Sequence, residues 1–494
     1  MGGFPALQTF LRGFRARAQQ EGGACFYFDC GDVFQGTPVV DHHRGACMIG
    51  LLNEVGAAGA ALGNHEFDYG LDRLGTLSEE AQYPLICANI VWKSSGRRPE
   101  FLVPMHMFKA GDIDIAVIGI LTPETMNITS PRNVEAIEIL DPLPIVNALA
   151  LQAREAGARF VILLSHCGLE GDIAMTDNMF GVDLILGGHS HSPMDAPLFR
   201  GPGRIPIVHP GANLTHVNEI IIDIAPGMEP ASLTFRQVPL YLEEWPEDPH
   251  VKAMVASFET GIADLKRVLG TAAIELNRGV IGGDSPQGSW VADAMREVAS
   301  ADFAFINFGG LRRPIFEGTI TEEDLFQLQP FDNAIDVLQM TGSQVIDLVE
   351  RSLSPNFLPI DEGARNVTIR LFRLDGTGLR REIEGYGYLL PSNLKVTFDP
   401  ERPAMSRIVT ITDGAGAPLD LTREYRVALN SYMSEGGDGF THLMKHTKRQ
   451  ATGIQVRDAV IRKTERDGGI PTKPDPRMFN LKLKVAPYQE APPP

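Results

Sequence analysis

The chain has 494 residues, 44% of them hydrophobic and 21% charged, and this length predicts two or three globular domains. Its 62 acidic residues outnumber its 44 Lys and Arg residues, and the net charge of −18 argues against a protein that binds nucleic acid by neutralising phosphates. An anionic small molecule would instead need a local cationic site, such as bound metal ions. No apolar run reaches the ~18 residues that a membrane-spanning helix needs, so no membrane span is expected.

The N-terminal segment predicts an amphipathic helix within Met1–Gln20, with apolar residues on one face. It has no continuous apolar core, so we do not interpret it as a signal peptide, and a cytoplasmic location is the default expectation. The five cysteines are irregularly spaced and predict neither a disulfide framework nor a Cys-x-x-Cys zinc site. The proline-rich end, residues 486–494, predicts a disordered tail.

Short apolar runs alternate with helical patterns through the first half of the chain. Several of these runs lead directly into glycine or polar residues, which is typical of a layered α/β fold with ligand-binding loops at the carboxyl ends of strands. A helix is expected between two of them at Leu143–Glu155. The expected strands are Ala24–Phe28, Ala57–Leu62, Leu85–Ala88, Ile113–Ile120, Phe160–Ser165, Asp183–Leu186 and Ile205–His209.

A change in composition near Glu243–Val251 marks a domain boundary. We expect a first domain over residues 1–245, a linker over 246–269 with a helix from about His250 to Leu269, and a second domain over 270–485. In the second domain, Ser285-Pro286 predicts the start of a helix. Its other expected elements are the strands Phe303–Phe308, Leu394–Phe398 and Tyr425–Leu429 and the helix Val345–Ser352.

Four segments of the first domain carry residues suited to metal and phosphate chemistry. Each follows an expected strand, and together they supply Asp32, Asn64, His65, Asp68, His166, His189 and His191. A carboxylate, an amide oxygen and imidazoles suit divalent metals of the Mn, Fe, Co or Zn class. Any one of these motifs alone is weak, because a single histidine at a strand end is more often structural. Their combination predicts a metal-assisted phosphate site, in which two metal ions would hold a hydroxide and a phosphoryl group.

Two of these segments, Gly31–Pro38 and Gly63–Gly70, closely resemble motifs of the two-domain 5′-nucleotidase family, and the likeness covers roughly residues 2–485. The resemblance implies an α/β fold: a four-layer α/β-β/α metallophosphatase sandwich, followed by a smaller α/β substrate-binding domain. It implies that Asp32 bridges two divalent metals and that Asn64, His166 and His189 complete the second metal site. His191 would bind the first metal. His65 would be the catalytic histidine, oriented by Asp68.

The second domain resembles the family as well. Arg312, at the end of Asn307–Arg312, matches an arginine that binds substrate in the family. Tyr432 matches a base-stacking aromatic and Asp438 a family aspartate. The partner aromatic is expected in Tyr386-Gly387-Tyr388, where Tyr388 fits better by its spacing. Ordinary packing of either tyrosine remains the alternative reading.

One family feature has no match in this sequence. The family opens with a strand that ends in Asp-x-His and supplies two ligands of the first metal, whereas Met1–Leu7 aligns with the helix that follows that strand. Asp32 and His191 are too few to hold that metal firmly, so the first site is expected to be incomplete. Two explanations stay open: a reading frame that begins upstream, with an export signal as in many family members, or a short form with weakened hydrolase activity.

The leading hypothesis is therefore a metal-dependent phosphohydrolase acting on nucleoside 5′-monophosphates, and on UDP-sugars or 2′,3′-cyclic nucleotides as further substrates. Two other hypotheses stay open: a relative of the same superfamily with a sulfur-containing or purely cyclic substrate, and a catalytically impaired nucleotide-binding protein. The resemblance also implies that rotation of the second domain carries substrate to the metals, with the helix near His250–Leu269 as the hinge.

Overall fold

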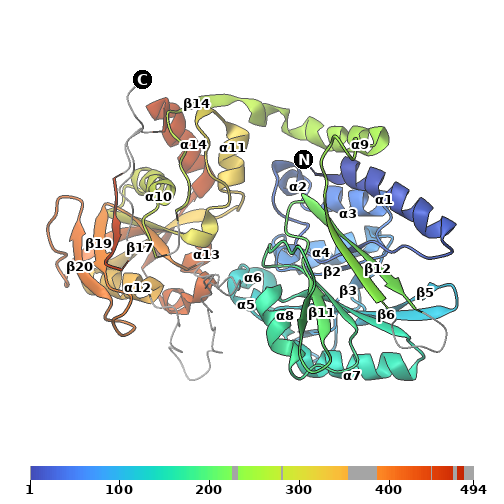
Figure 1. Cartoon of the computed structure of the whole chain (residues 1–494). Coiled ribbons are helices and arrows are strands. Elements are labelled where there is room, and N and C mark those ends of the chain that lie inside the picture. The colour runs from blue at the N-terminus through green and yellow to red at the C-terminus, as the bar shows by residue number, and fades with distance from the viewer. Residues whose placement is uncertain are drawn as a thin grey trace. The chain divides into compact units, whose positions relative to one another are not determined.

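The computed structural model describes residues 2–224, 232–279, 282–353, 387–446, 448–470 and 475–482. The chain divides into two compact units, Met1–Ala263 (unit 1) and Asp264–Pro494 (unit 2) (Figure 1). The expected tail, residues 486–494, lies outside the described residues. The helices of unit 1 are α1 (Phe4–Gln20), α2 (Pro38–His42), α3 (Ala46–Glu54), α4 (Leu71–Glu80), α5 (Thr125–Ile128), α6 (Pro131–Val134), α7 (Pro142–Glu155), α8 (Gly168–Thr176) and α9 (Pro249–Glu259).

The strands of unit 1 form two main sheets and two short pairs. The sheets have the orders β1-β2-β3 and β10-β11-β9-β8-β6-β5, and the pairs are β4-β7 and β12-β13. The bounds are β1 (Phe28–Asp29), β2 (Gly59–Ala61), β3 (Leu85–Ile86), β4 (Ile90–Trp92), β5 (Met105–Ala110), β6 (Ile113–Leu121), β7 (Ile137–Ile139), β8 (Phe160–His166), β9 (Leu184–Gly187), β10 (Leu198–Arg200), β11 (Ile205–Val208), β12 (His216–Asp223) and β13 (Ser232–Pro239).

Three hydrophobic clusters separate the four layers of unit 1. One joins α1, α3 and α4 to the three-stranded sheet, a second lies between the two sheets, and a third joins the six-stranded sheet to α7 and α8 (Figure 1). Strand β8 shows how the sequence builds this arrangement. Val161 and Leu163 pack toward the helices, whereas Ile162 and Leu164 pack toward the other sheet. Because successive side chains of a strand point to opposite faces, a continuous apolar run fits a strand buried on both sides. The four-layer prediction is confirmed.

Unit 2 is built around a five-stranded mixed sheet of order β18-β15-β21-β17-β22, with two three-stranded sheets, β16-β14-β23 and β20-β19-β24. Its strands are β14 (Val268–Ala272), β15 (Phe303–Asn307), β16 (Gly318–Thr321), β17 (Ala334–Thr341), β18 (Leu389–Ser392), β19 (Leu394–Phe398), β20 (Ile408–Asp413), β21 (Glu424–Asn430), β22 (Arg449–Gln455), β23 (Gly469–Ile470) and β24 (Met478–Asn480). Its helices are α10 (Pro286–Val298), α11 (Glu322–Leu328), α12 (Gly342–Leu353), α13 (Ser431–Ser434) and α14 (Val456–Asp467).

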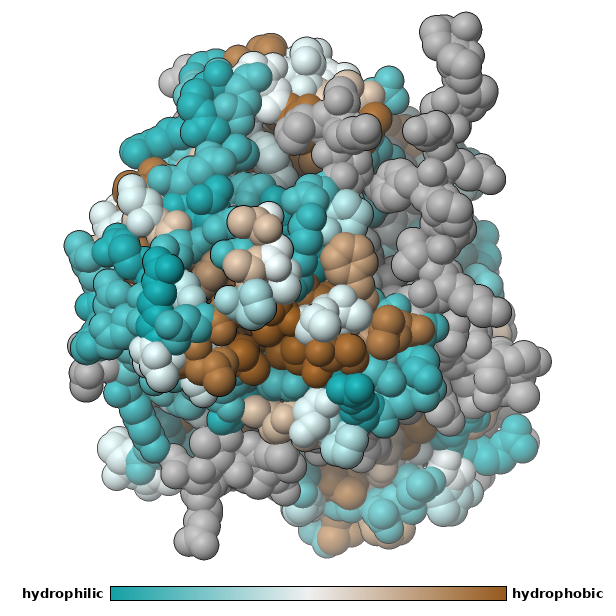
Figure 2. Space-filling view, turned by 90° about the vertical axis from the view of Figure 1, so that its left-hand side faces the viewer, coloured by the Kyte–Doolittle hydropathy of each residue, from teal (hydrophilic) through white to brown (hydrophobic). Residues whose placement is uncertain are grey.

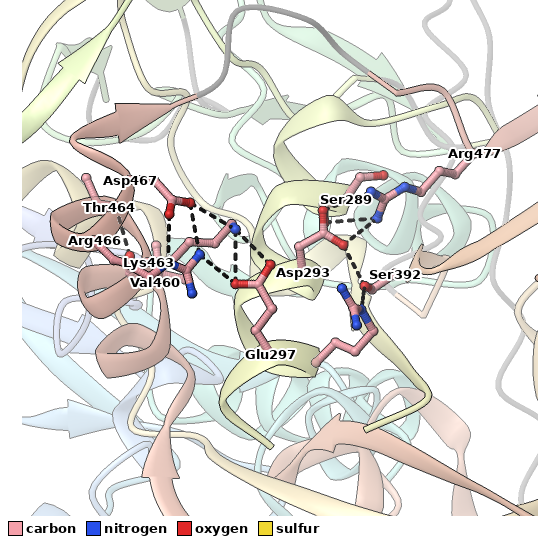
Figure 3. A network of polar contacts seen from close by, with 11 residues as sticks. Ser289, Asp293, Glu297, Ser392, Val460, Lys463, Thr464, Arg466, Asp467 and Arg477 are labelled. Atoms are coloured by element: carbon pink, nitrogen blue, oxygen red, sulfur yellow. Dashed lines mark hydrogen bonds and ion pairs between the residues drawn. The ribbon is translucent and has the colours of Figure 1, made fainter. Parts of the chain in front are cut away.

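Helix α10 begins where its sequence predicts. The Ser285 side chain accepts a hydrogen bond from the Gly288 N–H at 2.9 Å, and Pro286 occupies the first turn, where no N–H partner is needed. Two acidic residues one turn apart then tie the helix to other elements (Figure 3). Asp293 pairs with Arg477 at 2.8 Å, and Glu297 pairs with Lys463 of α14 at 2.9 Å.

Most of the expected strands form within a few residues of their predicted ends, although β1 is shorter than the run Ala24–Phe28. The helix expected over His250–Leu269 is wrong at its end. Helix α9 stops at Glu259, a 3₁₀ segment follows over Thr260–Lys266, and Leu269 lies in β14, buried against the core of unit 2. Tertiary pairing of β14 with β16 overrides the helical pattern there.

Figure 2 shows the side that carries β19 and β20, where hydrophilic residues predominate and apolar residues gather in one band. In the sheet β20-β19-β24 and just beyond it, Val409, Phe479 and Leu481 are exposed apolar side chains. Among the described residues, no helix combines the length and the apolar composition that crossing a membrane requires.

Candidate active site

Parallel strand pairing brings four chain segments to one edge of unit 1. In the six-stranded sheet, β8 pairs in parallel with β6 and β9, and β9 pairs in parallel with β11. In the three-stranded sheet, β1 pairs in parallel with β2. Asp32, Asn64 and His189 lie in the segments after these strands, and His166 is the last residue of β8. Parallel pairing therefore places their side chains at the carboxyl ends of the strands.

Two glycines let these loops approach closely. A Cβ atom on Gly31, whose φ is 90°, would lie 2.4 Å from the Gly63 nitrogen. A Cβ atom on Gly63 would lie 2.2 Å from Asp32 Oδ1 and 2.7 Å from His166 Cε1. Neither contact is possible for a larger residue, so the glycines of these motifs are required by the close packing of the loops.

Asp32, His166 and His189 form a cluster that suits a divalent metal. One ligand atom from each lies within 4.8 Å of the others. Asn64 is 4% exposed, and its Oδ1 is buried with no hydrogen-bond partner, as is Nε2 of His189. Buried polar atoms are normally paired, so these orphaned lone pairs fit ligands of a cation. Two imidazoles, a carboxylate and an amide oxygen are a donor set that fits a metal of the Mn, Fe, Co or Zn class.

Backbone contacts orient the ligands. His166 Nδ1–H donates to the carbonyl of Cys30, which leaves Nε2 directed to the cluster, 3.0 Å from Asp32 Oδ2. Asp32 and His189 both have a left-handed backbone, with φ of 68° and 73°. Non-glycine residues adopt this conformation only where surrounding contacts enforce it, and such residues concentrate at functional sites.

The ionisation of these groups is strongly coupled. Burial opposes the charge of Asp32, but the neighbouring His166 and His65 outweigh it and hold the Asp32 pKa well below its usual range. Burial likewise opposes a charge on His166, and the Asp32 carboxylate overcomes it and raises the His166 pKa to about 9. Burial, reinforced by His166, lowers the His189 pKa to about 3. Without metal, His166 is therefore protonated on both ring nitrogens and lies beside an ionised Asp32.

His65 and Asp68 form the expected dyad. His65 Nδ1 lies 2.7 Å from Asp68 Oδ2, and the His65 backbone N–H donates to Asp32 Oδ1 at 3.0 Å. The 3₁₀ turn His65–Phe67 makes the first contact possible, because residues three apart lie on one face of such a turn. The carboxylate fixes the ring beside the metal cluster.

Sequence reasoning missed the part played by Glu66. Its carboxylate is 3% exposed and accepts hydrogen bonds from the backbone N–H groups of Asp32 at 2.8 Å, Val33 at 2.7 Å, Phe34 at 3.2 Å and Gly63. One side chain thus joins the two loops that carry Asp32 and Asn64. A charged residue between His65 and a phenylalanine, in a stretch that is otherwise buried, is the only sequence signal for this role.

His191 does not join the cluster. Its side chain is exposed, and its backbone has a φ of 53°. His42 and His43 lie at the end of α2, where His43 Nε2 is 3.0 Å from the carbonyl oxygen of Phe258. The five cysteines are unpaired, as predicted.

A second group of predicted residues gathers at one edge of the five-stranded sheet of unit 2. Asn307 ends β15 and Tyr432 follows β21, and these two strands are parallel neighbours. Asn307 Nδ2 donates to Asp438 Oδ2 at 2.7 Å, and the Tyr432 hydroxyl donates to Asp438 Oδ1 at 2.8 Å. Burial raises the Asp438 pKa to about 6. The ring of Tyr432 packs on Gly437, where a Cβ atom would lie 2.4 Å from ring carbons.

The assignment of Tyr388 as the second stacking aromatic is wrong. Its side chain is 3% exposed in the hydrophobic core of unit 2, and its hydroxyl donates to the Gly283 carbonyl at 2.9 Å. So little of the ring is exposed that it offers no surface for a ligand. Tyr388 is therefore an ordinary core residue, the alternative that the sequence had left open. Tyr386 lies outside the described residues.

Phe331 is an aromatic residue that sequence reasoning passed over. It is half-buried, and the Arg312 guanidinium carbon lies 5.7 Å from the centre of its ring. It precedes β17, which pairs antiparallel with β21, so it emerges at the same sheet edge as Tyr432. The sequence signal for it is its position in the run Gln329-Pro330-Phe331.

Comparison with known proteins agrees with this geometry. Residues 1–193 match the family described as calcineurin-like phosphoesterase, and residues 268–445 match the 5′-nucleotidase C-terminal domain. The chain is 26% identical to a 5′-nucleotidase of Vibrio cholerae over 92% of this chain and 84% of that protein. It is 28% identical to Endonuclease YhcR of Bacillus subtilis over 67% of this chain, although the match spans only 29% of that protein. The crystal structure of a 5′-nucleotidase precursor from Thermus thermophilus has a TM-score of 0.84 at 24% identity, covering 98% of this chain and 94% of that one.

Unit 1 is therefore a metallophosphatase of the calcineurin-like class, with its histidine, asparagine and aspartate residues at the strand ends. The match of residues 268–445 to the 5′-nucleotidase C-terminal domain identifies the family within this class. The chain belongs to the 5′-nucleotidase family of hydrolases, which combines this domain with a C-terminal domain of its own type.

Proposed function

We propose that the protein hydrolyses nucleoside 5′-monophosphates at a metal centre in unit 1. The observation that carries the proposal is the cluster of Asp32, His166 and His189 with the His65–Asp68 dyad beside it. The similarity to 5′-nucleotidases along nearly the whole chain supports the substrate class. UDP-sugars and 2′,3′-cyclic nucleotides are further candidate substrates, because they present the same phosphate and base.

The metal and the dyad divide the chemistry. Asp32, Asn64, His166 and His189 would hold one divalent ion, and Asp32 with His191 would contribute to a second, less completely held one. Such ions lower the pKa of a bound water and polarise a phosphoryl oxygen. With Nδ1–H on the Asp68 carboxylate, a doubly protonated His65 ring would donate a hydrogen bond from Nε2 to the phosphoryl group or to the leaving oxygen. The Asp32 carboxylate, which accepts the His65 N–H, keeps the His65 backbone in place.

Unit 2 would bind the nucleoside. Arg312 presents a planar guanidinium, which suits phosphate or sugar oxygens. We propose Phe331 in place of Tyr388 as the partner of Tyr432, since both emerge at the same sheet edge. Stacking on aromatic rings tolerates any base, so a broad nucleotide preference is expected. Asp438, already bonded to Tyr432 and Asn307, would keep the tyrosine ring in position.

The test is phosphate release from AMP with Mn²⁺ present. His65→Ala is expected to lower kcat by roughly 10²–10⁴-fold, the usual contribution of an acid–base group, with the fold unchanged. His106→Ala, which removes an exposed histidine from β5, is the matched control and should keep the wild-type rate. Wild-type turnover in His65→Ala would overturn the catalytic assignment.

A panel of esters tests the substrate class. Nucleoside monophosphates should be cleaved faster than simple phosphate esters and sulfur-containing esters, because only the former engage unit 2. Binding of AMP without phosphate release by the wild-type chain, even with excess Mn²⁺, would contradict hydrolysis and leave a nucleotide-binding role.

A further inference from the structure

Asp172 and His209 form a buried pair that the proposed chemistry does not use. Asp172 lies in α8 and His209 directly after β11, and their side chains are 0% and 1% exposed. His209 Nε2 is 2.8 Å from Asp172 Oδ2. Because a carboxylate oxygen accepts hydrogen bonds, His209 donates from Nε2 to Asp172 Oδ2.

The pair is the middle of a longer hydrogen-bonded chain. At one end, the Ser165 hydroxyl donates to Asp172 Oδ1, and the Cys167 N–H donates to Ser165 Oγ at 3.2 Å. At the other end, Ser190 Oγ lies 3.4 Å from His209 Nδ1 and accepts the Leu169 N–H at 3.2 Å. The chain thus begins beside one candidate metal ligand and ends beside another, since Ser165 precedes His166 and Ser190 follows His189.

Strand β9 packs so closely against the Asp172–His209 pair that no additional atom fits between them. A Cβ atom on Gly187 would lie 2.0 Å from His209 Nε2 and 2.5 Å from Asp172 Oδ2. The next residue, Gly188, donates its N–H to the Ser165 carbonyl at 2.8 Å. The end of β9, and with it the backbone position of His189, is therefore fixed by direct contacts with Asp172, His209 and Ser165.

The backbone of His189 needs such support. Its left-handed φ of 73° is costly for a residue with a side chain and persists only where its neighbours enforce it. Ser190 supplies this constraint on the C-terminal side through its links to His209 and Leu169. A buried polar network whose members all have partners is rigid, because moving one member leaves another unpaired in a medium of low dielectric constant.

We infer that Asp172 and His209 are positioning residues, which set His166 and His189 at the spacing that metal binding requires. They act through Ser165 and Ser190 and contact no substrate. The inference rests on the proposed metal centre, and it concerns how strongly that centre binds metal rather than which ester it cleaves.

The test measures Mn²⁺ affinity by titration calorimetry on the full chain, alongside the melting temperature of the metal-free protein. His209→Leu keeps much of the ring's volume but removes both polar contacts, and it should weaken Mn²⁺ binding by roughly 10–100-fold, as loss of partners behind metal ligands usually does. His209→Gln can still donate to Asp172 and should recover most of the affinity. Val146→Ala, a buried position on α7, is the control and should lower the melting temperature without changing the affinity.

The possible results distinguish a positioning role of the Asp172–His209 pair from a merely structural one. If His209→Leu lowers the melting temperature as Val146→Ala does and binds Mn²⁺ like the wild type, the pair is merely structural and the inference is wrong. If His209→Leu does not fold, Ser190→Ala gives the same test from the half-buried end of the chain, and unchanged affinity there contradicts the inference. Absence of Mn²⁺ binding by the wild type would overturn the metal centre itself.

Discussion

At the scale of single residues, the surroundings of a histidine rather than its residue type determine its role. Three histidines of unit 1 illustrate this: His166 pairs with Asp32, His189 offers an orphaned nitrogen, and His209 pairs with Asp172 away from the ligands. The sequence motifs singled out the first two as neighbours of Asp32, because both lie at the ends of apolar runs that predict strands. They could not distinguish the third, since its partner lies 37 positions away.

Asp438 allows a prediction about pH. Burial raises its pKa to about 6 from the ordinary 3.8, so the folded state retains this proton to a higher pH than the unfolded chain. Its contribution to stability is therefore most favourable below about pH 4 and is lost as the pH rises toward 6, by about 3 kcal/mol for a shift of roughly two units. Asp438→Asn, which tolerates the left-handed φ of 51°, should lack this loss.

The measurement is the urea midpoint of unfolding at pH 4, 5.5 and 7. The variant should gain stability relative to the wild type across this range, whereas Asp112→Asn, at an exposed turn, should follow the wild type. A constant difference between Asp438→Asn and the wild type would show that Asp438 does not titrate in this range.

At the scale of elements, helices and strands with strong local signals were predictable and their ends were less so. Helix α10 has a serine cap and a first-turn proline, and it begins where these predict. The stretch after α9 has a helical pattern but ends in β14, because pairing with β16 and burial of Leu269 favour a strand. Such pairing joins residues about 50 positions apart, which no local pattern records.

Helix α10 also supports a prediction about stability. Arg477 bonds both oxygens of Asp293 at 2.8 Å and the Pro391 carbonyl at 3.0 Å, with its side chain 11% exposed (Figure 3). Arg477→Ala leaves Asp293 without its cation, and the free energy of unfolding should fall by about 3 kcal/mol.

Arg466→Ala is the matched control, because Arg466 pairs with Glu297 on the same helix while remaining 57% exposed. Solvent screens that pair, so the urea midpoint should hardly move. If Arg477→Ala and Arg466→Ala lower the urea midpoint equally, burial of the Arg477–Asp293 pair adds nothing to the free energy of unfolding.

At the scale of the whole molecule, the metal centre belongs to unit 1 and the proposed nucleoside residues to unit 2. Mn²⁺ should therefore raise the melting temperature of unit 1 selectively, since only that unit contains the cluster. Metal at 100 times its Kd stabilises the binding state by about 2.7 kcal/mol. Differential scanning calorimetry with Mn²⁺ and with a chelator measures this shift.

His166→Ala removes one ligand and should abolish most of the stabilisation by Mn²⁺. The corresponding control is Tyr432→Phe in unit 2, which leaves the cluster intact and should respond like the wild type. An equal response of the His166 variant would place the metal elsewhere in the chain.

The family, the layered fold and the residues Asp32, Asn64, His65, Asp68, His166 and His189 were all readable from the chain alone. These depend on short motifs at strand ends, where glycine, apolar runs and polar residues follow one another in a fixed local order. Three features depended on the tertiary structure. They are the hydrogen bonds of Glu66 to two loops, the exchange of roles between Tyr388, which is buried in the core, and Phe331, which lies at the sheet edge, and the Asp172–His209 pair. Each is a contact between segments distant in the chain, and which distant segments meet is decided by how strands pair and which faces they bury.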